Sequence, residues 1–296
     1  MKLLSKIDIH VHTTEFKAFG GELEHTYASC DELLAMYDRV NIQYGNILPE
    51  TANEGSSFIT TNEEIIRVVK KHPDRFGFFM SLDPRGLKNS PESNFDFIMD
   101  YYKRQGAKGV GEMCCNVWFD DPRSMNFFSY CEKHELPVIF HIGAPKNDYG
   151  MIDEIGLPHL EKVLQTFPKL KILGHSQKFW AHISGDCTEE IWDTYPPGKV
   201  KSGGRLIELL DKYPNLCCDI SAGSGYNALT RDEKFGCEFI ERYQDRVYFG
   251  TDICDPKNNM RHGEWLDAMV TSGNISYAAY EKVSRKNALE LLKIDL

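Results

Sequence analysis

A short unit that recurs along the chain limits the folds that it can adopt. In each copy a helical stretch ends in a polar turn, often with Pro, and a short apolar strand follows. Five copies lie at residues 70–79, 132–140, 165–173, 211–218 and 242–249. Proline suits the turn because it cannot continue a helix and moves the preceding residue out of the helical region. Repetition of this unit is typical of strands and helices that alternate around a parallel sheet.

The remaining segments complete a set of eight predicted strands. They lie near residues 6–12, 38–44, 76–82, 107–113, 137–142, 170–175, 216–221 and 246–252. A capping box at residues 61–64 opens one helix. Helical spacing of apolar residues marks others at 126–134, 158–166, 204–212 and 284–292. Eight such units predict an α/β fold, a single (β/α)8 TIM barrel that spans residues 1–296 as one domain. An open doubly wound sheet is the alternative, but no glycine-rich phosphate-binding motif follows an early strand.

The composition is that of an acidic globular protein and narrows its partners. Of the 296 residues, 42% are hydrophobic and 26% are charged. A chain of this length and hydrophobic content can bury a substantial core. A net charge of -10 with no basic stripe disfavours nucleic acid. No leader peptide or membrane-length apolar run is visible, and the nine cysteines form no Cys-x-x-Cys pair. We expect a cytoplasmic protein with free thiols and a small-molecule substrate, without a membrane partner, and a homodimer stays open.

The chain begins with a strand that carries two histidines on one face. Residues 7–12, Ile-Asp-Ile-His-Val-His, alternate apolar and polar side chains with the period of a strand. Because successive strand side chains point to opposite faces, His10 and His12 point the same way. Two imidazoles on one face form half of a metal site. Two packed histidines would give the same pattern, so the interpretation depends on what the later strands supply.

The later strands supply matching ligands where they end. His12 ends the first predicted strand, Glu112 the fourth, His141 the fifth, His175 the sixth and Asp252 the eighth. In a barrel these ends converge on one mouth. Each residue alone has a structural explanation, as a packed histidine, a helix cap or a paired carboxylate. Their joint occurrence favours a metal site, and imidazoles with carboxylates suit zinc or a related divalent ion.

Two long connections after predicted strands are expected to shape the substrate pocket, because such loops form the catalytic face of a barrel. They cover residues 177–203 and 222–235. Trp180, His182 and Arg231 lie on them and are candidate substrate contacts. Ordinary loop packing would explain these three residues equally well.

The same motifs give the chain a resemblance to the amidohydrolase superfamily, in the branch known as amidohydrolase-related or amidohydrolase 2. The matching stretches are Ile-Asp-Ile-His-Val-His, Phe-His-Ile-Gly, Leu-Gly-His-Ser and Phe-Gly-Thr-Asp, at the first, fifth, sixth and eighth predicted strands. The resemblance spans essentially the whole chain and implies a (β/α)8 barrel that holds a divalent metal, usually zinc, with manganese left open. It is specific to the superfamily rather than to a substrate.

The resemblance implies a ligand set for one metal ion. In the mononuclear members, residues that match His10, His12, His141 and Asp252 bind the ion. The residue that matches His175 holds the bound water or the substrate. One ion is the favoured expectation.

A second ion stays open because binuclear relatives bridge two ions with a carboxylate or carboxylated lysine on the fourth strand. That position is Glu112 in this chain, and His175 would then bind the second ion. We expect a metal-dependent hydrolase that attacks a small amide, lactone or ester with a metal-activated water. Asp252 would act as the general base and His175 would polarise the substrate carbonyl. Asp8 is expected to orient a metal ligand.

Two other functions remain open. The same branch contains metal-dependent decarboxylases of aromatic or muconate-type acids, which use the same ligands. A barrel that binds metal or a metabolite without turnover is a further alternative. Hydrolysis comes first because Glu112 leaves a binuclear site open, whereas the decarboxylases are mononuclear.

Overall fold

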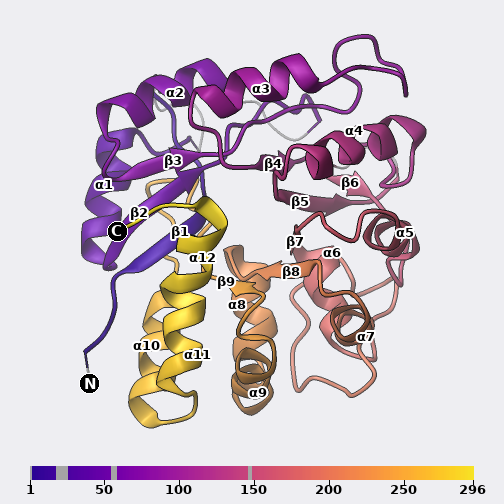
Figure 1. Ribbon diagram of the computed structural model, residues 1–296. Helices are drawn as coiled ribbons and strands as arrows, with labels where there is room; N and C mark the ends of the chain where they lie inside the picture. Colours follow the sequence, from indigo (N-terminus) through magenta and orange to yellow (C-terminus); the bar gives the residue numbers. More distant parts are fainter. Residues whose placement is uncertain (1, 18–25, 55–58, 146–148) are drawn as a thin grey trace.

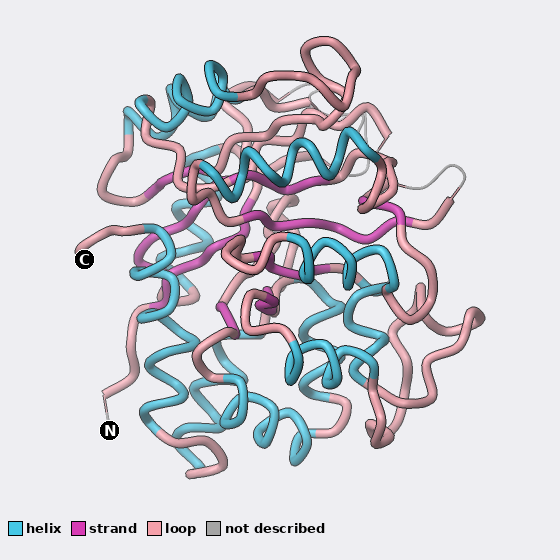
Figure 2. Tube along the Cα trace, turned by 45° about the vertical axis from the view of Figure 1, so that its right-hand side comes forward, coloured by secondary structure: helices cyan, strands magenta, loops and turns pink. Residues whose placement is uncertain are grey.

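The computed structural model describes residues 2–17, 26–54, 59–145 and 149–296, and its paired strands are parallel. Figure 1 shows the strands near the middle of the molecule with helices around them, and the turned view of Figure 2 shows the same arrangement. The strands are β1 (Lys6–Val11), β2 (Ile42–Ile47), β3 (Phe76–Phe78), β4 (Val110–Met113), β5 (Val138–Gly143), β6 (Met151–Ile152), β7 (Ile172–His175), β8 (Leu216–Asp219) and β9 (Val247–Tyr248).

The helices follow the strands in sequence. They are α1 (Cys30–Arg39), α2 (Asn62–Lys71), α3 (Asp96–Arg104), α4 (Pro122–Lys133), α5 (Pro158–Thr166), α6 (Gln177–Trp180), α7 (Arg205–Lys212), α8 (Ala222–Thr230), α9 (Glu233–Tyr243), α10 (His262–Ser272), α11 (Tyr277–Glu281) and α12 (Asn287–Leu292). A 3-10 turn, Ala181–Ile183, follows α6, and a π-helical turn, Lys282–Lys286, joins α11 to α12. In the described part of the chain, no helix combines the length and the apolar character needed to cross a membrane.

Hydrogen bonds join the edges of two sheets. One sheet runs β1-β2-β3 and the other β4-β5-β7-β8-β9, with β6 paired to β5 outside that order. Beyond β3, Met80 donates its N–H to Gly109 O (2.9 Å) and accepts from the N–H of Gly111 (3.0 Å). At the other junction, the N–H of Asp252 donates to His10 O (2.7 Å). These bonds place the strands in the order of a (β/α)8 barrel, and the predicted fold class is confirmed.

The strands pack on α12 through an apolar cluster. It combines buried residues of β1, β2, β5, β7, β8 and β9 with Ala288, Leu291 and Leu292 of α12. A larger apolar cluster lies between the strands and the surrounding helices. Burial of these two sets of apolar side chains is the main stabilising contribution to the fold. The polar strand ends are thereby held on a rigid scaffold.

The second strand begins later than predicted. The sequence predicts a strand over residues 38–44, but α1 continues to Arg39 and β2 begins at Ile42. Ser29 and Glu32 form a reciprocal capping box that starts α1. The buried residues of α1 have helical spacing and are Leu33, Met36 and Tyr37. This buried face extends the helix into the predicted strand and moves the end of β2 toward residue 50.

Residues 222–235 form helices rather than the predicted loop. Ala222–Thr230 is α8, and α9 begins at Glu233. Gly225 of α8 lies against the backbone that follows β8, where a Cβ atom would be 2.1 Å from the carbonyl oxygen of Ile220. Glycine at this position therefore allows α8 to pack closely on the barrel.

Replacing Gly225 with Ala should lower the free energy of unfolding by about 1–3 kcal/mol, because the added methyl group meets backbone that cannot move aside. Gly263→Ala in α10 is the matched control, since its Cβ would have no neighbour closer than 3.4 Å. The control should unfold at the same or slightly higher urea concentration. Equal stability of the two variants would contradict the close packing of α8.

Candidate metal centre

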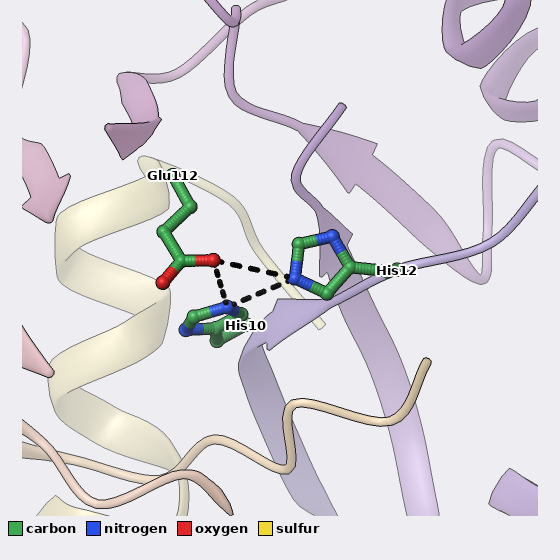
Figure 3. Close-up of side chains that lie close together, drawn as sticks. All are labelled: His10, His12 and Glu112. Atoms are coloured by element: carbon green, nitrogen blue, oxygen red, sulfur yellow. Dashed lines mark hydrogen bonds and ion pairs between the residues drawn. The ribbon is translucent and has the colours of Figure 1, made fainter. Parts of the chain in front are cut away.

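Four side-chain atoms lie at the spacing of ligands around one ion. The Nε2 atoms of His10 and His12 are 3.1 Å apart. Glu112 Oε2 lies 3.4 and 3.6 Å from these two nitrogens, and Asp252 Oδ1 lies 3.5 and 3.3 Å from them. Figure 3 shows His10, His12 and Glu112 turned toward one another. Ligands bound at about 2.1 Å to a tetrahedral ion are about 3.4 Å apart, so the spacing fits.

The second oxygen of Glu112 faces the other two predicted histidines. Glu112 Oε1 lies 3.1 Å from His141 Nδ1 and 3.7 Å from His175 Nε2. The carboxylate of Asp252 is also shared between the two sets of histidines. Its Oδ1 faces His10 and His12, and its Oδ2 lies 3.7 Å from His175 Nε2. The family resemblance implies that His141 binds one ion together with His10, His12 and Asp252. In the structure His141 is instead grouped with His175 and Glu112. The structure brings all six predicted ligands together.

Hydrogen bonds on the far side of two rings decide which nitrogen faces the cluster. His12 donates its Nδ1–H to Leu48 O (2.9 Å), and His10 donates its Nδ1–H to Asp219 Oδ2 (2.6 Å). Carbonyl and carboxylate oxygens only accept, so each neutral ring presents the lone pair of Nε2 to the cluster. Two lone pairs 3.1 Å apart repel each other unless positive charge lies between them. A divalent ion or a proton between the rings would supply that charge.

Ser221 extends this support to His175. Its hydroxyl donates to Asp219 Oδ2 (2.9 Å) and accepts from Nδ1–H of His175 (2.9 Å). Nε2 of His175 therefore also presents a lone pair to the cluster. The sequence patterns single out neither Asp219 nor Ser221. Asp219 ends β8 in the structure, two residues before the end of the seventh predicted strand (216–221), so the strand-end rule applied to the observed strand would have included it.

The carboxylates of the cluster attract positive charge. Burial alone would lower the pKa of His12, but hydrogen bonds to Asp252 and Glu112 outweigh burial and raise it to about 9. Burial is likewise outweighed at His10, where Asp219 and Glu112 raise the pKa well above its usual value. The same pairing lowers the pKa of Glu112 although burial opposes it. Protons or a divalent ion can supply the positive charge, and an ion would release the protons.

A cavity of about 230 Å³ opens onto the cluster. Tyr27 stacks on His12 with 5.9 Å between ring centroids, and the ring centroid of Tyr149 lies 4.3 Å from that of His141. Glu50 also lines the cavity. The sequence patterns missed Glu50 because the predicted second strand ends six residues before it, whereas β2 ends at Ile47.

Two predicted substrate contacts lie outside the cavity lining and pack in the structure. Trp180 is buried and donates its indole N–H to Asp219 O (3.1 Å). Trp180 therefore helps to fix Asp219, which accepts a hydrogen bond from His10. Arg231 donates to Pro196 O (3.4 Å). Both residues therefore fit the alternative interpretation of the sequence, in which they pack within the protein and do not contact the substrate.

The third predicted substrate contact, His182, joins two segments in the interior. Its Nδ1–H donates to Lys178 O (2.7 Å), and its Nε2 accepts from the N–H of Gly156 (2.9 Å). Burial lowers the pKa of His182 to about 4. The ring is therefore a neutral bridge between backbone groups.

Asp8 joins the first strand to the last and does not contact a ligand ring. Its Oδ1 accepts from the N–H groups of His10 (3.0 Å) and Thr251 (3.0 Å). Its Oδ2 accepts from the hydroxyls of Tyr37 (2.8 Å) and Thr251 (2.5 Å). The pairing of β1 with β2 shifts register between Asp8 and Val11, so strict alternation does not extend along this strand.

Known proteins resemble this chain over nearly its whole length. The family model described as Amidohydrolase matches residues 7–294. No curated protein matches the chain in sequence. Among solved structures, an uncharacterised TIM-barrel protein from Bordetella bronchiseptica is 19% identical, with 98% of this chain and 99% of that chain covered and a TM-score of 0.65.

Two further structures are enzymes. A dihydroxybenzoic acid decarboxylase from Polaromonas sp. JS666, with bound manganese and the inhibitor 2-nitroresorcinol, is 17% identical, with 98% of this chain and 97% of that chain covered and a TM-score of 0.64. A probable 2-pyrone-4,6-dicarboxylic acid hydrolase from Acinetobacter baumannii, with citric acid bound, is 14% identical, with 98% and 100% covered and a TM-score of 0.57. At these identities the likeness shows the fold.

Asp219→Asn should weaken zinc binding about 10- to 100-fold, the range for residues that orient metal ligands. The carboxylate accepts at both oxygens, from Ser221 N–H and from His10 Nδ1–H, and an amide can accept at only one. Competition with a chromophoric chelator measures the affinity. Asp211→Asn, in an exposed pair with Arg242, is the control. Equal affinities in the two variants would contradict the role of Asp219.

A neutral His182 should make the protein lose stability as the pH falls from about 6.5 to about 4. The unfolded chain, with the usual histidine pKa, binds the proton more readily in this range, which removes about 3 kcal/mol of unfolding free energy. His182→Gln keeps one acceptor and one donor and should flatten the pH dependence in urea titrations. Identical pH dependence in wild type and variant would show that the pKa of His182 is not lowered.

Proposed function

Because the chain belongs to the amidohydrolase family, we propose that it is a metal-dependent hydrolase that attacks a small amide, lactone or ester with an activated water. The proposal is carried by the division of the Glu112 carboxylate. Its Oε2 faces His10 and His12 at 3.4 and 3.6 Å. Its Oε1 faces His141 and His175 at 3.1 and 3.7 Å. A carboxylate shared between two groups of ligands suits two divalent ions.

Two groups of side chains would hold the ions. The first contributes His10 and His12, the second contributes His141 and His175, and both share Glu112 and Asp252. A bound ion lowers the pKa of a water so that hydroxide forms near neutral pH, and it polarises a substrate carbonyl. Imidazole and carboxylate donors suit zinc, and the manganese in the Polaromonas decarboxylase supports manganese as an alternative.

Asp252 would act as the general base. Its side chain is 24% exposed and lines the cavity, so water in the cavity is within its reach. Burial would raise the pKa of Asp252, but His10 and His12 outweigh burial and lower it. The carboxylate is therefore ionised near neutral pH and can accept the proton of the attacking water.

The contact with Ser221 favours His175 as a ligand. A neutral ring that donates Nδ1–H to Ser221 has no proton on Nε2 to give to a carbonyl. Burial and the neighbouring His10 lower the pKa of His175, which keeps the ring neutral. We therefore assign His175 to the second ligand group, in place of the expected role at the substrate carbonyl.

A metal-dependent decarboxylase of an aromatic or muconate-type acid is the second candidate. Its support is the likeness to the Polaromonas dihydroxybenzoic acid decarboxylase over 98% of this chain. In that case one ion would suffice, and Glu112 would support the ligands without bridging. The number of bound ions therefore separates the two candidates.

Protein purified without chelator should contain two divalent ions per chain by elemental analysis. Glu112→Gln should retain one, because an amide nitrogen cannot complete the bridge. Glu208→Gln, in an exposed pair with Arg205, is the control and should retain two. One ion in the wild type would favour decarboxylation. No metal, even after incubation with excess zinc, would exclude the proposed mechanism.

The reaction is assigned by assays on the same protein. Small amides, lactones and esters are tested for hydrolysis, and 2,6-dihydroxybenzoate is tested for release of carbon dioxide. Asp252→Asn should lower the hydrolytic rate at least about 100-fold while the folded structure is retained, since it removes the base. Carbon dioxide release without hydrolysis would establish the second candidate.

A further inference from the structure

We propose that Glu50 recognises a positively charged nitrogen group on a small substrate, an amine, amidine or guanidine, and so sets the substrate class of the cavity. The inference rests on the proposed function in one respect, that the cavity beside the metal ligands binds the substrate. Glu50 itself belongs to neither of the two groups of predicted ligands.

The backbone around Glu50 holds its carboxylate at the cavity. Glu50 lies three residues after β2 and is only 5% exposed. Its N–H donates to Thr60 Oγ1 (2.9 Å), and its carbonyl accepts from the N–H of Thr60 (2.8 Å). Its Oε1 accepts from the N–H of Ala52 (2.7 Å). These bonds leave the side chain little freedom to turn away from the cavity that it lines.

The carboxylate of Glu50 forms no ion pair with a side chain in the described part of the chain. Among residues 2–17, 26–54, 59–145 and 149–296, no Lys, Arg or His forms an ion pair with it. Glu112 and Cys114 lie beside it, with one ligand atom of each of the three residues within 4.8 Å of the others. A buried carboxylate in such surroundings is stabilised by a cation that enters from the cavity.

In the proposed site, Glu112 and Asp252 would hold the metal ions, and Glu50 would not be a ligand. Among the described residues, the carboxylates of Glu50, Glu112 and Asp252 line the cavity. Glu112 and Asp252 contact the histidine nitrogens and would be neutralised by bound ions. Glu50 makes no such contact with the histidines and would keep its charge. The carboxylate of Glu50 is then available to pair with a cationic group of the substrate at its own side of the cavity.

The size and walls of the cavity restrict the substrate further. At about 230 Å³ it is smaller than the usual pocket of about 300–1,000 Å³, so it suits one ring or a short chain. The rings of Tyr27 and Tyr149 lie over His12 and His141 and form aromatic walls. Aromatic faces also attract cations. A small planar cation meets all three conditions.

Benzamidine and benzoate test the proposal because they have the same shape and opposite charge. Dissociation constants are measured by NMR titration of metal-loaded wild type, Glu50→Gln and Glu50→Asp. Glu50→Gln should weaken benzamidine about tenfold and strengthen benzoate, since it removes one charge without changing the size of the side chain. Glu50→Asp keeps the charge and should keep the preference for benzamidine. Glu238→Gln, exposed on α9, is the control for both probes.

Opposite changes for the two probes would support the proposal, because loss of a purely structural role would weaken both. The proposal would be overturned if Glu50→Gln weakened both probes equally or changed the affinity of neither. It would also be overturned if the wild type bound benzoate more tightly than benzamidine. Metal content is measured on each sample. Two bound ions with no effect of Glu50→Gln would refute the substrate class alone. Opposite probe changes in a protein that binds no metal would refute the proposed hydrolysis and keep the role of Glu50.

Discussion

The site depends on the junction between the first and last strands of the barrel. The N–H of Asp252 donates to His10 O (2.7 Å), and the buried carboxylate of Asp8 accepts from the N–H and the hydroxyl of Thr251. Asp252 has a φ of 55°, in the left-handed region that few residues adopt. Backbone strain of this kind persists where surrounding contacts hold it in place. Asp8 thus acts on the cluster through the backbone, by fixing the strand end from which the Asp252 carboxylate reaches two groups of histidines.

The hydrogen bonds of Asp219 and Ser221 connect those two groups. Asp219 accepts from His10, while Ser221 donates to Asp219 and accepts from His175. One histidine of each group is therefore oriented by the same buried pair. Removing one member of a connected polar network changes the geometry of the others, because a buried donor left without an acceptor must move or be desolvated at a cost. The two groups of ligands are accordingly a single unit.

Much of the fold and of the ligand set could be predicted from the sequence, because both follow from local periodicity. Parallel strands bring their ends together, so a strand-end histidine such as His141 is a ligand candidate without any knowledge of distances. The contacts of Asp8 could not be predicted, since they join β1 to Thr251 beyond β9, a long-range pairing that periodicity does not encode. Glu50 was missed because the second strand was predicted too early in the sequence. The packing of α8 depends on the close contact of Gly225 with the backbone of Ile220, which periodicity does not predict. The split of Glu112 between two histidine groups depends on side-chain geometry, which periodicity does not encode.

Charge is the property by which this cavity differs most from one suited to an aromatic acid. An anionic substrate must be held near the metal ligands by donors or cations, and the side chains at the cavity include the carboxylates of Glu50 and Asp252. Bound ions could attract such a substrate directly, but Glu50 would then oppose it at close range. A substrate that carries a cation at one end and a carbonyl at the other avoids this conflict. Glu50 would hold the cation, and the carbonyl would face Asp252 and the ligand groups. A Glu50 carboxylate that binds a cation therefore favours such a substrate over an aromatic acid.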